Sequence, residues 1–590
     1  MRISRVTIKN YRNLKDVDIQ LENLVTLIGE NNGGKSNFLR ALTLPLLSDE
    51  AALSKQLSWY DINHDAKNDF YKYVSENRDS IVKGTLDVTT FLPHIPMVTV
   101  KLEMEPADTE HYDIKDLLAE ENDGKLIACM QYTYQVEKPE KLLEWVRELL
   151  SSDVVIQDIK MSILPMELYT YSITVPGKNS EVAYDTLHKF RYVTLPAERD
   201  SFAANSDRLG ARALVDVLKD KLTPSAQIKI EQEYVKFFET IRNSGKLDEI
   251  LNWQDYSDIP NAGQFFAKIS ILPNMPTMSS ILNSIRLGYE EENLSFQGLG
   301  YRNLILMMVM LNSYLNKPHD LSLRLVTVEE PEAHLCVSNI LLMASFFNLF
   351  SKKNGYTQLV YSTHNAEFVN KVGLEKVVVI HGGTAYSLKE ELGNEERDYL
   401  ANNPNTDIFK ILFSHRVIMV EGITEELLIK SYLQTKPELN EIKVVSFHKG
   451  YKNIIKLWKK INAGTSNRLG VVRDRDQNQE NARREHEKLQ DDQIIVRTTK
   501  EYTLEPEIVE AGNNYELLKN RYGDVYSWAD KSRKDLQEDW RKRKTDVILR
   551  LCHDLVNGEL PTFKMPKHIQ DILDFLQGNG NTVGADNDAN

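Results

Sequence analysis

The chain has 590 residues, of which 42% are hydrophobic and 27% charged, and its formal net charge is −14. This composition is typical of a globular protein with several domains, and it excludes collagen-like, coiled-coil and wholly disordered chains. Three widely spaced cysteines exclude a disulfide framework and a cysteine-rich zinc site. The acidic total means that any site for nucleic acid must be a local basic patch.

The first residues, "MRISRVTIKN", lack the apolar segment of a signal peptide. The longest apolar run, residues 304–311, is far too short to span a membrane. We therefore expect a cytoplasmic protein that makes no membrane contact.

Residues 1–28 predict a β-hairpin followed by a buried strand, because apolar residues alternate along "VDIQL" and then run together in "LVTLIG". A helix is expected from "KSNFLRALTLPLL". Residues 81–104 and 161–195 hold further β-rich runs, "GTLDVTTFL", "MVTVKLEME" and "YSITV".

A glycine-rich loop, "GENNGGKS", lies between the buried strand and that helix. Its spacing matches a P-loop, in which backbone N–H groups and a helix N-terminus hold phosphate. Lys35 is expected to reach the β- and γ-phosphates, and the Ser36 hydroxyl to bind Mg²⁺. The expected nucleotide-binding set is Gly29, Asn32, Gly33, Gly34, Lys35, Ser36 and Asn37.

Residues 207–251 have apolar side chains at helical spacing and predict a helical insertion over 201–261. Two interpretations remain open for this apolar face: a core contact within the chain, or a surface for self-association. Farther on, "LSFQGLGYRN" precedes a long apolar helix. Ser295 and the following glycines could face a nucleotide held by a second subunit, although an ordinary glycine-rich turn fits equally well.

Two buried strands end in groups suited to ATP chemistry. "LRLVTVEE" ends in Glu329, expected to hold Mg²⁺, and Glu330, expected to polarise the attacking water. "LVYSTH" ends in His364, which could sense the γ-phosphate or cap the chain structurally. Alternating strands and helices here predict a mostly parallel sheet.

The order of these elements resembles the RecF/SMC branch of the ABC ATPases, whose heads are split by a large insertion. The resemblance implies an ATPase head formed by residues 1–200 and 262–400. It also implies that two heads sandwich ATP and that Arg12 contributes near the nucleotide.

A polar stretch, residues 389–407, marks the main domain boundary, and a second strand–helix series follows. One strand ends in Glu421, with Glu425 four residues on. Another ends in Asp474, with Asp476 two residues on. Both strand ends of a parallel sheet open on one edge, where four carboxylates would repel one another unless cations neutralise them. Oxygen ligands favour Mg²⁺ or Mn²⁺, and two ions could flank a phosphodiester.

This arrangement resembles the TOPRIM fold, which is Rossmann-like, and an ABC-type head followed by TOPRIM resembles the OLD (overcoming lysogenization defect) family of ATP-dependent endonucleases. The resemblance implies a nuclease domain over 408–576, with Glu505 of "YTLEPEIV" as a further metal ligand. It also implies a late lysine that stabilises the scissile phosphate. Lys544 is the better match and Lys542 the alternative, and the "RKRK" run could instead be a solvated helix face.

We therefore predict an α/β protein that hydrolyses ATP and cuts DNA with Mg²⁺ or Mn²⁺. Either Glu421 or Glu425 would be a metal ligand or general base. Arg473 and Arg475 either contact DNA or balance charge. The resemblance implies phage defence, a dimer or tetramer, and a possible helicase or reverse-transcriptase partner. The polar tail, 577–590, is expected to be disordered.

One rival is an ATP-gated DNA clamp or sensor of the RecF/SMC type with an inactive TOPRIM domain. Another is a topoisomerase or primase. A topoisomerase would need a nucleophilic tyrosine from a further domain, and the residues after Asp476 leave little room for one.

Overall fold

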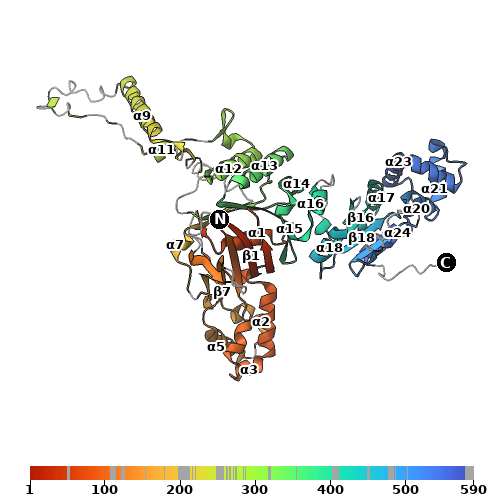
Figure 1. The fold of residues 1–590 in the computed structure, drawn as a ribbon, viewed down its shortest axis with the longest axis horizontal. Helices are drawn as coiled ribbons and strands as arrows, with labels where there is room; N and C mark the ends of the chain where they lie inside the picture. Colours follow the sequence, from red (N-terminus) through yellow and green to blue (C-terminus); the bar gives the residue numbers. More distant parts are fainter. Residues whose placement is uncertain are drawn as a thin grey trace.

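The structure is a computed structural model. A block of sheets forms its centre, and the C-terminal part lies on one side of this block (Figure 1). A helical arm extends below the block, and the long helix α9 lies above it. The residues that the structure describes are 1–49, 54–106, 115–120, 126–152, 154–178, 180–196, 213–215, 217–219, 221–246, 258, 260, 263–264, 268–269, 272, 276–282, 285, 287–315, 321–353, 355–401, 409, 411–447, 452–475, 484, 487–500 and 503–578.

A seven-stranded sheet forms the centre of the molecule, in the order β15-β14-β3-β13-β12-β9-β4. All neighbours pair in parallel except β14 and β15. Its strands are β3 (Leu24–Gly29), β4 (Leu47–Ser48), β9 (Phe190–Leu195), β12 (Leu323–Glu329), β13 (Thr357–Ser362), β14 (Val377–His381) and β15 (Thr384–Ser387). Strands β3 and β13 are buried along their whole length, as expected for a parallel sheet covered on both faces.

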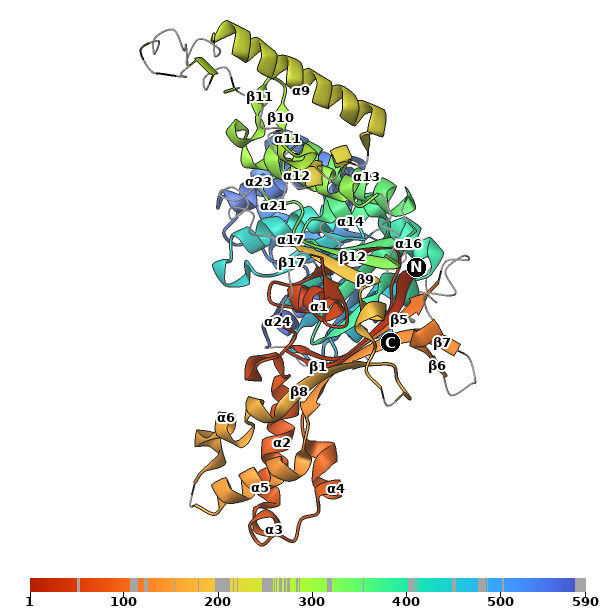
Figure 2. The same ribbon diagram turned by 90° about the vertical axis from the view of Figure 1, so that its left-hand side faces the viewer.

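An antiparallel sheet packs against the first one through helix α1 (Lys35–Thr43). Its order is β2-β1-β5-β7-β6, with β8 on β7. The strands are β1 (Arg2–Tyr11), β2 (Leu14–Gln20), β5 (Val98–Glu105), β6 (Leu118–Glu120), β7 (Leu126–Val136) and β8 (Tyr169–Thr174). Figure 2 shows α1 between the two sheets. Its buried Phe38, Leu39 and Leu42 join a core shared by both.

A helical arm interrupts the antiparallel sheet, and one part of it corrects the sequence prediction. Its main helices are α2 (His64–Glu76), α3 (Arg78–Val82), α4 (Val88–Phe91), α5 (Pro139–Leu150) and α6 (Lys160–Ile163). The run "GTLDVTTFL" was expected to be a strand, but it contains α4. Phe91 is fully buried, and its ring centroid lies 5.8 Å from that of Phe70 on α2, so tertiary packing overrides local β propensity here.

The other face of the parallel sheet is covered by helices α12 (Leu299–Ser313), α13 (Val337–Lys353) and α14 (Ala366–Val372). Helix α12 confirms the long apolar helix expected around "LSFQGLGYRN". The insertion predicted over 201–261 contains α9 (Pro224–Ser244), which Figure 2 shows projecting from this side. No described residue of α9 is buried.

The C-terminal part is built on a four-stranded parallel sheet in the order β17-β16-β18-β19. Its strands are β16 (Arg416–Val420), β17 (Lys443–Ser446), β18 (Arg468–Arg473) and β19 (Ile494–Thr498). Its helices are α17 (Ile423–Gln434), α18 (Lys452–Ile461), α20 (Leu504–Glu510), α21 (Asn514–Tyr526), α22 (Arg533–Lys542), α23 (Lys544–Val556) and α24 (Lys567–Gln577). Helix α24 includes Gln577, the first residue assigned to a disordered tail, and residues 579–590 lie outside the described part.

One hydrophobic core joins the two parallel sheets. Ile28 and Val379 of the central sheet belong to the same buried cluster as Val417, Met419 and Trp458 of the C-terminal part. The boundary predicted over 389–407 contains two short helices, α15 (Leu388–Glu391) and α16 (Asn394–Ala401). Leu388, Leu392 and Leu400 pack into that shared core. Among the described helices, none has both the length and the apolar character needed to cross a membrane.

Candidate functional sites

The glycine-rich loop follows β3 and opens helix α1, the context expected for a P-loop. Gly29 must be glycine, because a Cβ atom there would lie 2.4 Å from the Ile380 carbonyl oxygen. Gly34 is the N-cap of α1 with φ 112°, and Asn32 has φ 62°. These left-handed conformations turn the loop around the helix N-terminus, where the helix dipole favours anions.

Lys35 is held inside this loop. Its Nζ donates to the carbonyl oxygens of Gly29 (3.0 Å) and Glu30 (2.8 Å). Burial lowers the pKa of the Lys35 ammonium, and nearby Glu330 and Glu332 act in the opposite direction. Gly33 closes the loop by donating its N–H to Glu30. The arrangement fits the triphosphate of a nucleotide, because the loop N–H groups and the lysine converge on one place.

The magnesium-binding pair predicted for the nucleotide site is in contact. Ser36 Oγ lies 3.0 Å from Glu329 Oε2. The two residues are distant in sequence, and the neighbouring positions of β3, β13 and β12 in the sheet bring them together. A hydroxyl and a carboxylate beside the P-loop are oxygen ligands of the kind that Mg²⁺ prefers.

Glu330 and His364, the other two residues predicted to take part in ATP chemistry, also lie close to each other. His364 Nε2 is 3.5 Å from Glu330 Oε1, and Glu330 has φ 43°. Burial and the Lys35 ammonium lower the pKa of His364, so its imidazole is neutral near pH 7. Glu332 was not singled out from the sequence, although it belongs to the "EEPE" run. Its Oε1 accepts hydrogen bonds from Thr363 Oγ1 (2.7 Å) and the His364 N–H (2.8 Å) and thereby positions His364.

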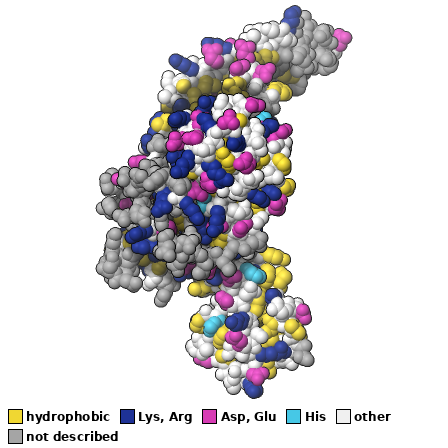
Figure 3. Space-filling view, turned by 90° about the vertical axis from the view of Figure 1, so that its right-hand side faces the viewer, with side chains coloured by type: hydrophobic (Ala, Val, Ile, Leu, Met, Phe, Trp, Pro, Cys, Tyr) yellow, Lys and Arg dark blue, Asp and Glu magenta, His cyan; other side chains and the backbone are white. Residues whose placement is uncertain are grey.

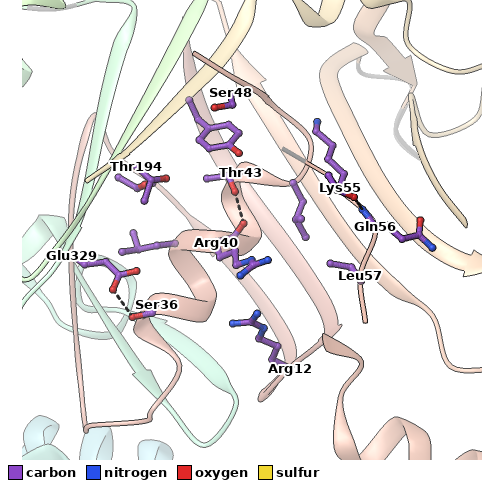
Figure 4. A pocket seen from close by; sticks show the side chains of 15 residues that line it. Arg12, Ser36, Arg40, Thr43, Ser48, Lys55, Gln56, Leu57, Thr194 and Glu329 are labelled. Atoms are coloured by element: carbon purple, nitrogen blue, oxygen red, sulfur yellow. Dashed lines mark hydrogen bonds between the residues drawn. The ribbon is translucent and has the colours of Figure 1, made fainter. Parts of the chain in front are cut away.

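Arg12 lies beside the start of α1, as Figure 4 shows. Its guanidinium donates to Asn37 Oδ1 (2.8 Å) and to Asp61 Oδ1 (2.7 Å). Asn37 in turn donates to Asn13 Oδ1. Asp61 was missed by sequence reasoning, because nothing in its local pattern marks it as the partner of an arginine 49 positions earlier.

Ser295 lies in a single 3-10 turn, Leu294–Phe296, just before α12. A Cβ atom at Gly300 would lie 2.4 Å from the His334 carbonyl oxygen, so this glycine serves the packing of α12. None of the described contacts joins the turn to the P-loop of the same chain.

The C-terminal sheet brings Glu421 and Asp474 together at its carboxyl edge. Glu421 follows β16 and Asp474 follows β18, and these strands are parallel neighbours. The Glu421 carboxylate accepts hydrogen bonds from the Asp474 backbone N–H (3.0 Å) and from Arg473 (3.3 Å). Arg473 is only 3% exposed and pairs with Glu421, so it balances charge within the protein.

Asp474 is the most perturbed carboxyl group of this edge. Burial, together with repulsion by Glu425 and Glu421, raises its pKa to about 8. Its Oδ1 is buried and has no hydrogen-bond partner. Glu425, on the first turn of α17, is 3% exposed. Ionised carboxylates packed this way need a cation to stabilise them.

Glu505 and Lys544 complete the cluster from the far end of the chain. Glu505 is 3% exposed, and its Oε1 lies 3.1 Å from Lys544 Nζ. Burial alone would lower the pKa of Lys544, but attraction to Glu505, Glu425 and Asp474 outweighs it and raises the pKa. Lys542 is exposed at the end of α22. The structure thus places Lys544, not Lys542, among the acidic residues.

The residues of this edge fit a divalent cation. Asp474 Oδ1 and Glu505 Oε2 are buried oxygens without hydrogen-bond partners among the described residues. The atoms that these carboxyl groups offer to a cation are all oxygens, which Mg²⁺ prefers. Within the described residues, no three His, Cys, Asp or Glu side chains already stand close enough to form a complete metal site. Asp476, the other predicted ligand, lies outside the described residues.

Two neighbouring residues have structural roles. Glu426, which sequence reasoning passed over, is buried and accepts a hydrogen bond from the Ser446 N–H (2.9 Å), so it ties α17 to β17. The Arg475 guanidinium donates to the Lys500 carbonyl oxygen (3.1 Å), which ties this side chain to the segment after β19.

Two different protein-family models match the N-terminal and C-terminal parts of the chain. A family model described as an AAA ATPase domain matches residues 1–77 and 211–369. A model of the overcoming lysogenization defect protein-like TOPRIM domain matches residues 412–476. The chain joins an AAA ATPase domain to an OLD-like TOPRIM domain. The resemblance to the OLD family and the predicted α/β fold class are therefore confirmed.

Two curated relatives are similar along most of the chain. Endonuclease GajA of Bacillus cereus strain VD045 is 22% identical over 442 residues, which cover 74% of this chain and 69% of the relative. Endonuclease GajA of strain HuB5-5 is 21% identical over 504 residues, covering 74% and 68%. Among solved structures, the SMC head domain from Thermotoga maritima superposes with a TM-score of 0.28 at 12% identity, over 65% of this chain and 97% of that one. The domains and the GajA relatives together support an ATPase and a nuclease.

Proposed function

We propose that this protein is an ATP-regulated, divalent-metal-dependent DNA endonuclease. The observation that carries the proposal is the cluster of Glu421, Glu425, Asp474, Glu505 and Lys544 at the carboxyl edge of the TOPRIM sheet. Buried acids with one lysine among them suit phosphodiester hydrolysis better than a structural role, because an unneutralised cluster destabilises the fold. The relatives named endonuclease support the same reaction.

Bound Mg²⁺ or Mn²⁺, one ion or two, would supply an activated water and charge stabilisation. Asp474 and Glu505 would hold it through their unpaired oxygens, with Asp476 completing the set. Lys544 would place its ammonium against the scissile phosphate and stabilise the negative charge that develops there. Glu421 or Glu425 would serve as a further ligand or accept the proton of the attacking water.

The DNA would approach the side of the molecule that carries the C-terminal residues. Figure 3 shows Lys and Arg side chains gathered there among acidic ones. Such a local patch is what an acidic protein needs to hold a phosphate backbone. Arg541 and Lys542, exposed beside Lys544, are the basic residues that we assign to this contact.

In the ATPase domain, the P-loop set with Lys35 would hold the phosphates of ATP, and Ser36 with Glu329 would hold Mg²⁺. Glu330 would polarise the attacking water, and neutral His364 would sense the γ-phosphate. Arg12 and Asn37 would contact the nucleotide beside the start of α1, while a second copy would contribute Ser295. The core shared by the two sheets gives the ATPase a direct mechanical connection to the nuclease.

Self-association is part of this proposal. Helix α9 presents Ile228, Val235, Phe237 and Ile241 on its surface, each at least 37% exposed, and apolar side chains of this size on one projecting helix suit a partner helix. We assign residues 201–261 to dimerisation, or to assembly of a tetramer. The remaining boundaries stay as predicted, 1–200 and 262–400 for the ATPase and 408–576 for the nuclease.

The biological setting is proposed on the OLD resemblance alone. We assign the protein to antiviral defence in the cytoplasm, acting by itself or with a helicase or reverse-transcriptase partner. Loss of protection against phage in cells that carry Asp474→Ala, with wild-type protein levels, tests this assignment.

The deciding experiment is cleavage of supercoiled plasmid by purified protein with Mg²⁺ or Mn²⁺, with and without ATP. Wild type is expected to cut, Asp474→Ala to be inactive, and Asp530→Asn, an exposed acid of the same domain, to cut normally. Lys35→Ala shows how the ATPase controls cleavage, with exposed Lys72→Ala as its control. If no metal supports cutting while ATP is hydrolysed and DNA is bound, the endonuclease proposal fails and the ATP-gated clamp is favoured.

A further inference from the structure

A pocket of about 540 Å³ lies beside the proposed magnesium pair, and Figure 4 shows its walls. One wall is helix α1 with Ser36 and Arg40. Strands β9 and β12 form a second wall, and residues 54–57 form the third. The pocket therefore opens directly onto Ser36 and Glu329, where the terminal phosphate of a bound nucleotide would lie.

Lys55 gives this pocket an unneutralised charge. Its Nζ is buried and has no hydrogen-bond partner. Burial lowers the pKa of Lys55 to about 8, and no acid among the described residues counteracts this. The side chain is still mostly protonated near pH 7, so the fold carries a buried ammonium that pairs with no counter-ion in the described part of the chain. That arrangement costs stability unless an anion occupies the pocket.

The segment that carries Lys55 is fixed by tyrosines of the antiparallel sheet. Tyr132 donates to the Lys55 carbonyl oxygen (2.6 Å), and Tyr134 donates to that of Leu57 (2.8 Å). Gln56 Nε2 donates to the Tyr169 carbonyl oxygen (2.9 Å) and to Tyr134 Oη (3.1 Å). The backbone that carries Lys55 is thus held in place before any ligand arrives, which lowers the entropic cost of binding.

The other charged groups of the lining leave it positive. Arg40 is exposed and forms no ion pair with any described residue. Arg12 already pairs with Asp61, and Glu329 already contacts Ser36. Thr327 donates to Thr194 Oγ1 (2.9 Å), and both of these hydroxyl-bearing residues line the cavity. Cations with adjacent hydroxyls are the chemistry that recognises a tetrahedral oxyanion.

We propose that this pocket is a binding site for inorganic phosphate, with Lys55 as its principal contact and Arg40 as the second. The phosphate would come either from ATP hydrolysed in the adjacent site or from solution. The first source rests on the proposed ATPase activity, whereas the second does not. A phosphate held here would delay reopening of the nucleotide site after hydrolysis.

Binding from solution is tested by calorimetric titration of inorganic phosphate, at matched ionic strength, into the full chain carrying Lys35→Ala. That background weakens phosphate binding by the P-loop itself. Adding Lys55→Met is expected to weaken the remaining affinity by about tenfold or more, because a charge-assisted contact is lost. Lys55→Arg should retain binding, and Lys83→Met, an exposed lysine of the arm, should leave it unchanged.

Thermal unfolding shows whether Lys55→Met loses phosphate binding because the fold is destabilised. Phosphate is expected to raise the Tm of the Lys35→Ala protein by linkage. Lys55→Met should have the same or a higher Tm without phosphate, since it removes a buried charge, and should gain nothing from phosphate. Absence of phosphate binding in the Lys35→Ala background, or equal binding after Lys55→Met, overturns the proposal.

The source is decided by single-turnover hydrolysis with a fluorescent phosphate sensor. If the pocket receives the product, Lys55→Met releases phosphate faster than wild type while the ATP cleavage step keeps its rate. An unchanged release rate together with lost binding from solution supports the site and assigns its ligand to solution. A failure of DNA cleavage would leave both measurements intact, so the two proposals fail separately.

Discussion

The two sites of this molecule handle charge in opposite ways. In the nucleotide site, the Lys35 ammonium donates hydrogen bonds to two backbone carbonyl groups no more than six residues away. At the TOPRIM edge, acids from positions 421, 425, 474 and 505 meet with too few positive partners, and the pKa of Asp474 rises to about 8. A P-loop is locally self-sufficient before its anion binds, whereas the acidic edge keeps repulsion among its own carboxyl groups.

This difference in how charge is balanced predicts that substitutions will affect the two sites differently. Replacing Lys35 leaves only the backbone carbonyl groups of Gly29 and Glu30 without their donor, so no buried charge remains. At the acidic edge, removing Lys544 would leave Glu505 buried and unpaired. The following predictions use that contrast, from the largest expected effect to the smallest.

Glu330→Gln is expected to lower ATP hydrolysis by about a hundredfold or more, because it removes the group that we propose polarises the attacking water. ATP binding should be unchanged, since Lys35 and the loop N–H groups remain. Steady-state hydrolysis and fluorescent nucleotide binding measure the two effects. Exposed Glu395→Gln serves as the control. Equal loss of binding and hydrolysis would assign Glu330 to binding instead.

Lys544→Met is expected to reduce plasmid cleavage by about a hundredfold, since one charged donor to the scissile phosphate is lost. Lys542→Met should reduce cleavage only through weaker DNA binding, an effect that low salt restores. Cleavage rates of both variants at two salt concentrations make the comparison. A larger catalytic loss for Lys542→Met would contradict the placement of Lys544.

Glu505→Gln is expected to weaken metal activation by about tenfold to a hundredfold, because it removes the charge of a ligand. The dependence of cleavage rate on Mn²⁺ concentration should shift to higher metal. Glu516→Gln, an exposed residue of α21, provides the matched control. An unshifted metal dependence would remove Glu505 from the metal site.

The metal-free protein should lose stability as pH rises. The pKa of Asp474 is about 8 in the folded state, against 3.8 as its ordinary value. Between these values the folded state holds a proton that the unfolded state releases, so stability falls from the acid side of the window toward pH 8. With chelator present, the Tm advantage of Asp474→Asn over wild type should grow across this range. Adding Mg²⁺ should shrink it, and a constant difference would refute the assignment.

Gly470→Ala should destabilise the TOPRIM domain without touching either site. A Cβ atom there would lie 2.2 Å from Ile572 Cγ2 of α24, so β18 and α24 must separate. Overpacking of this kind costs about 1 to 3 kcal/mol. Chemical denaturation measures the loss, and Gly355→Ala, where no atom lies within 4 Å, is the control. Equal stability of the two variants would mean that α24 moves freely.

Much of the fold could be predicted because its signals are local. The buried strands β3, β12, β13 and β14 appear as apolar runs in the sequence. The arm could not be predicted, because the β-branched run before Phe91 favours strand until α2 supplies a surface for it. In the nucleotide site, the P-loop follows from sequence, while Asp61 and Glu332 depend on long-range contacts.

The sequence by itself determined the chemistry of this protein: a loop that holds phosphate, strand ends that carry acids, and a lysine near the C-terminus. It could do so because residue type and spacing set those capacities within a few positions. Only the tertiary structure decided which groups meet. It chose Lys544 over Lys542, paired Arg473 with Glu421, and buried the Lys55 ammonium with no counter-ion among the residues that the structure describes. Those outcomes depend on burial and on charges brought together from distant parts of the chain, which no local pattern records.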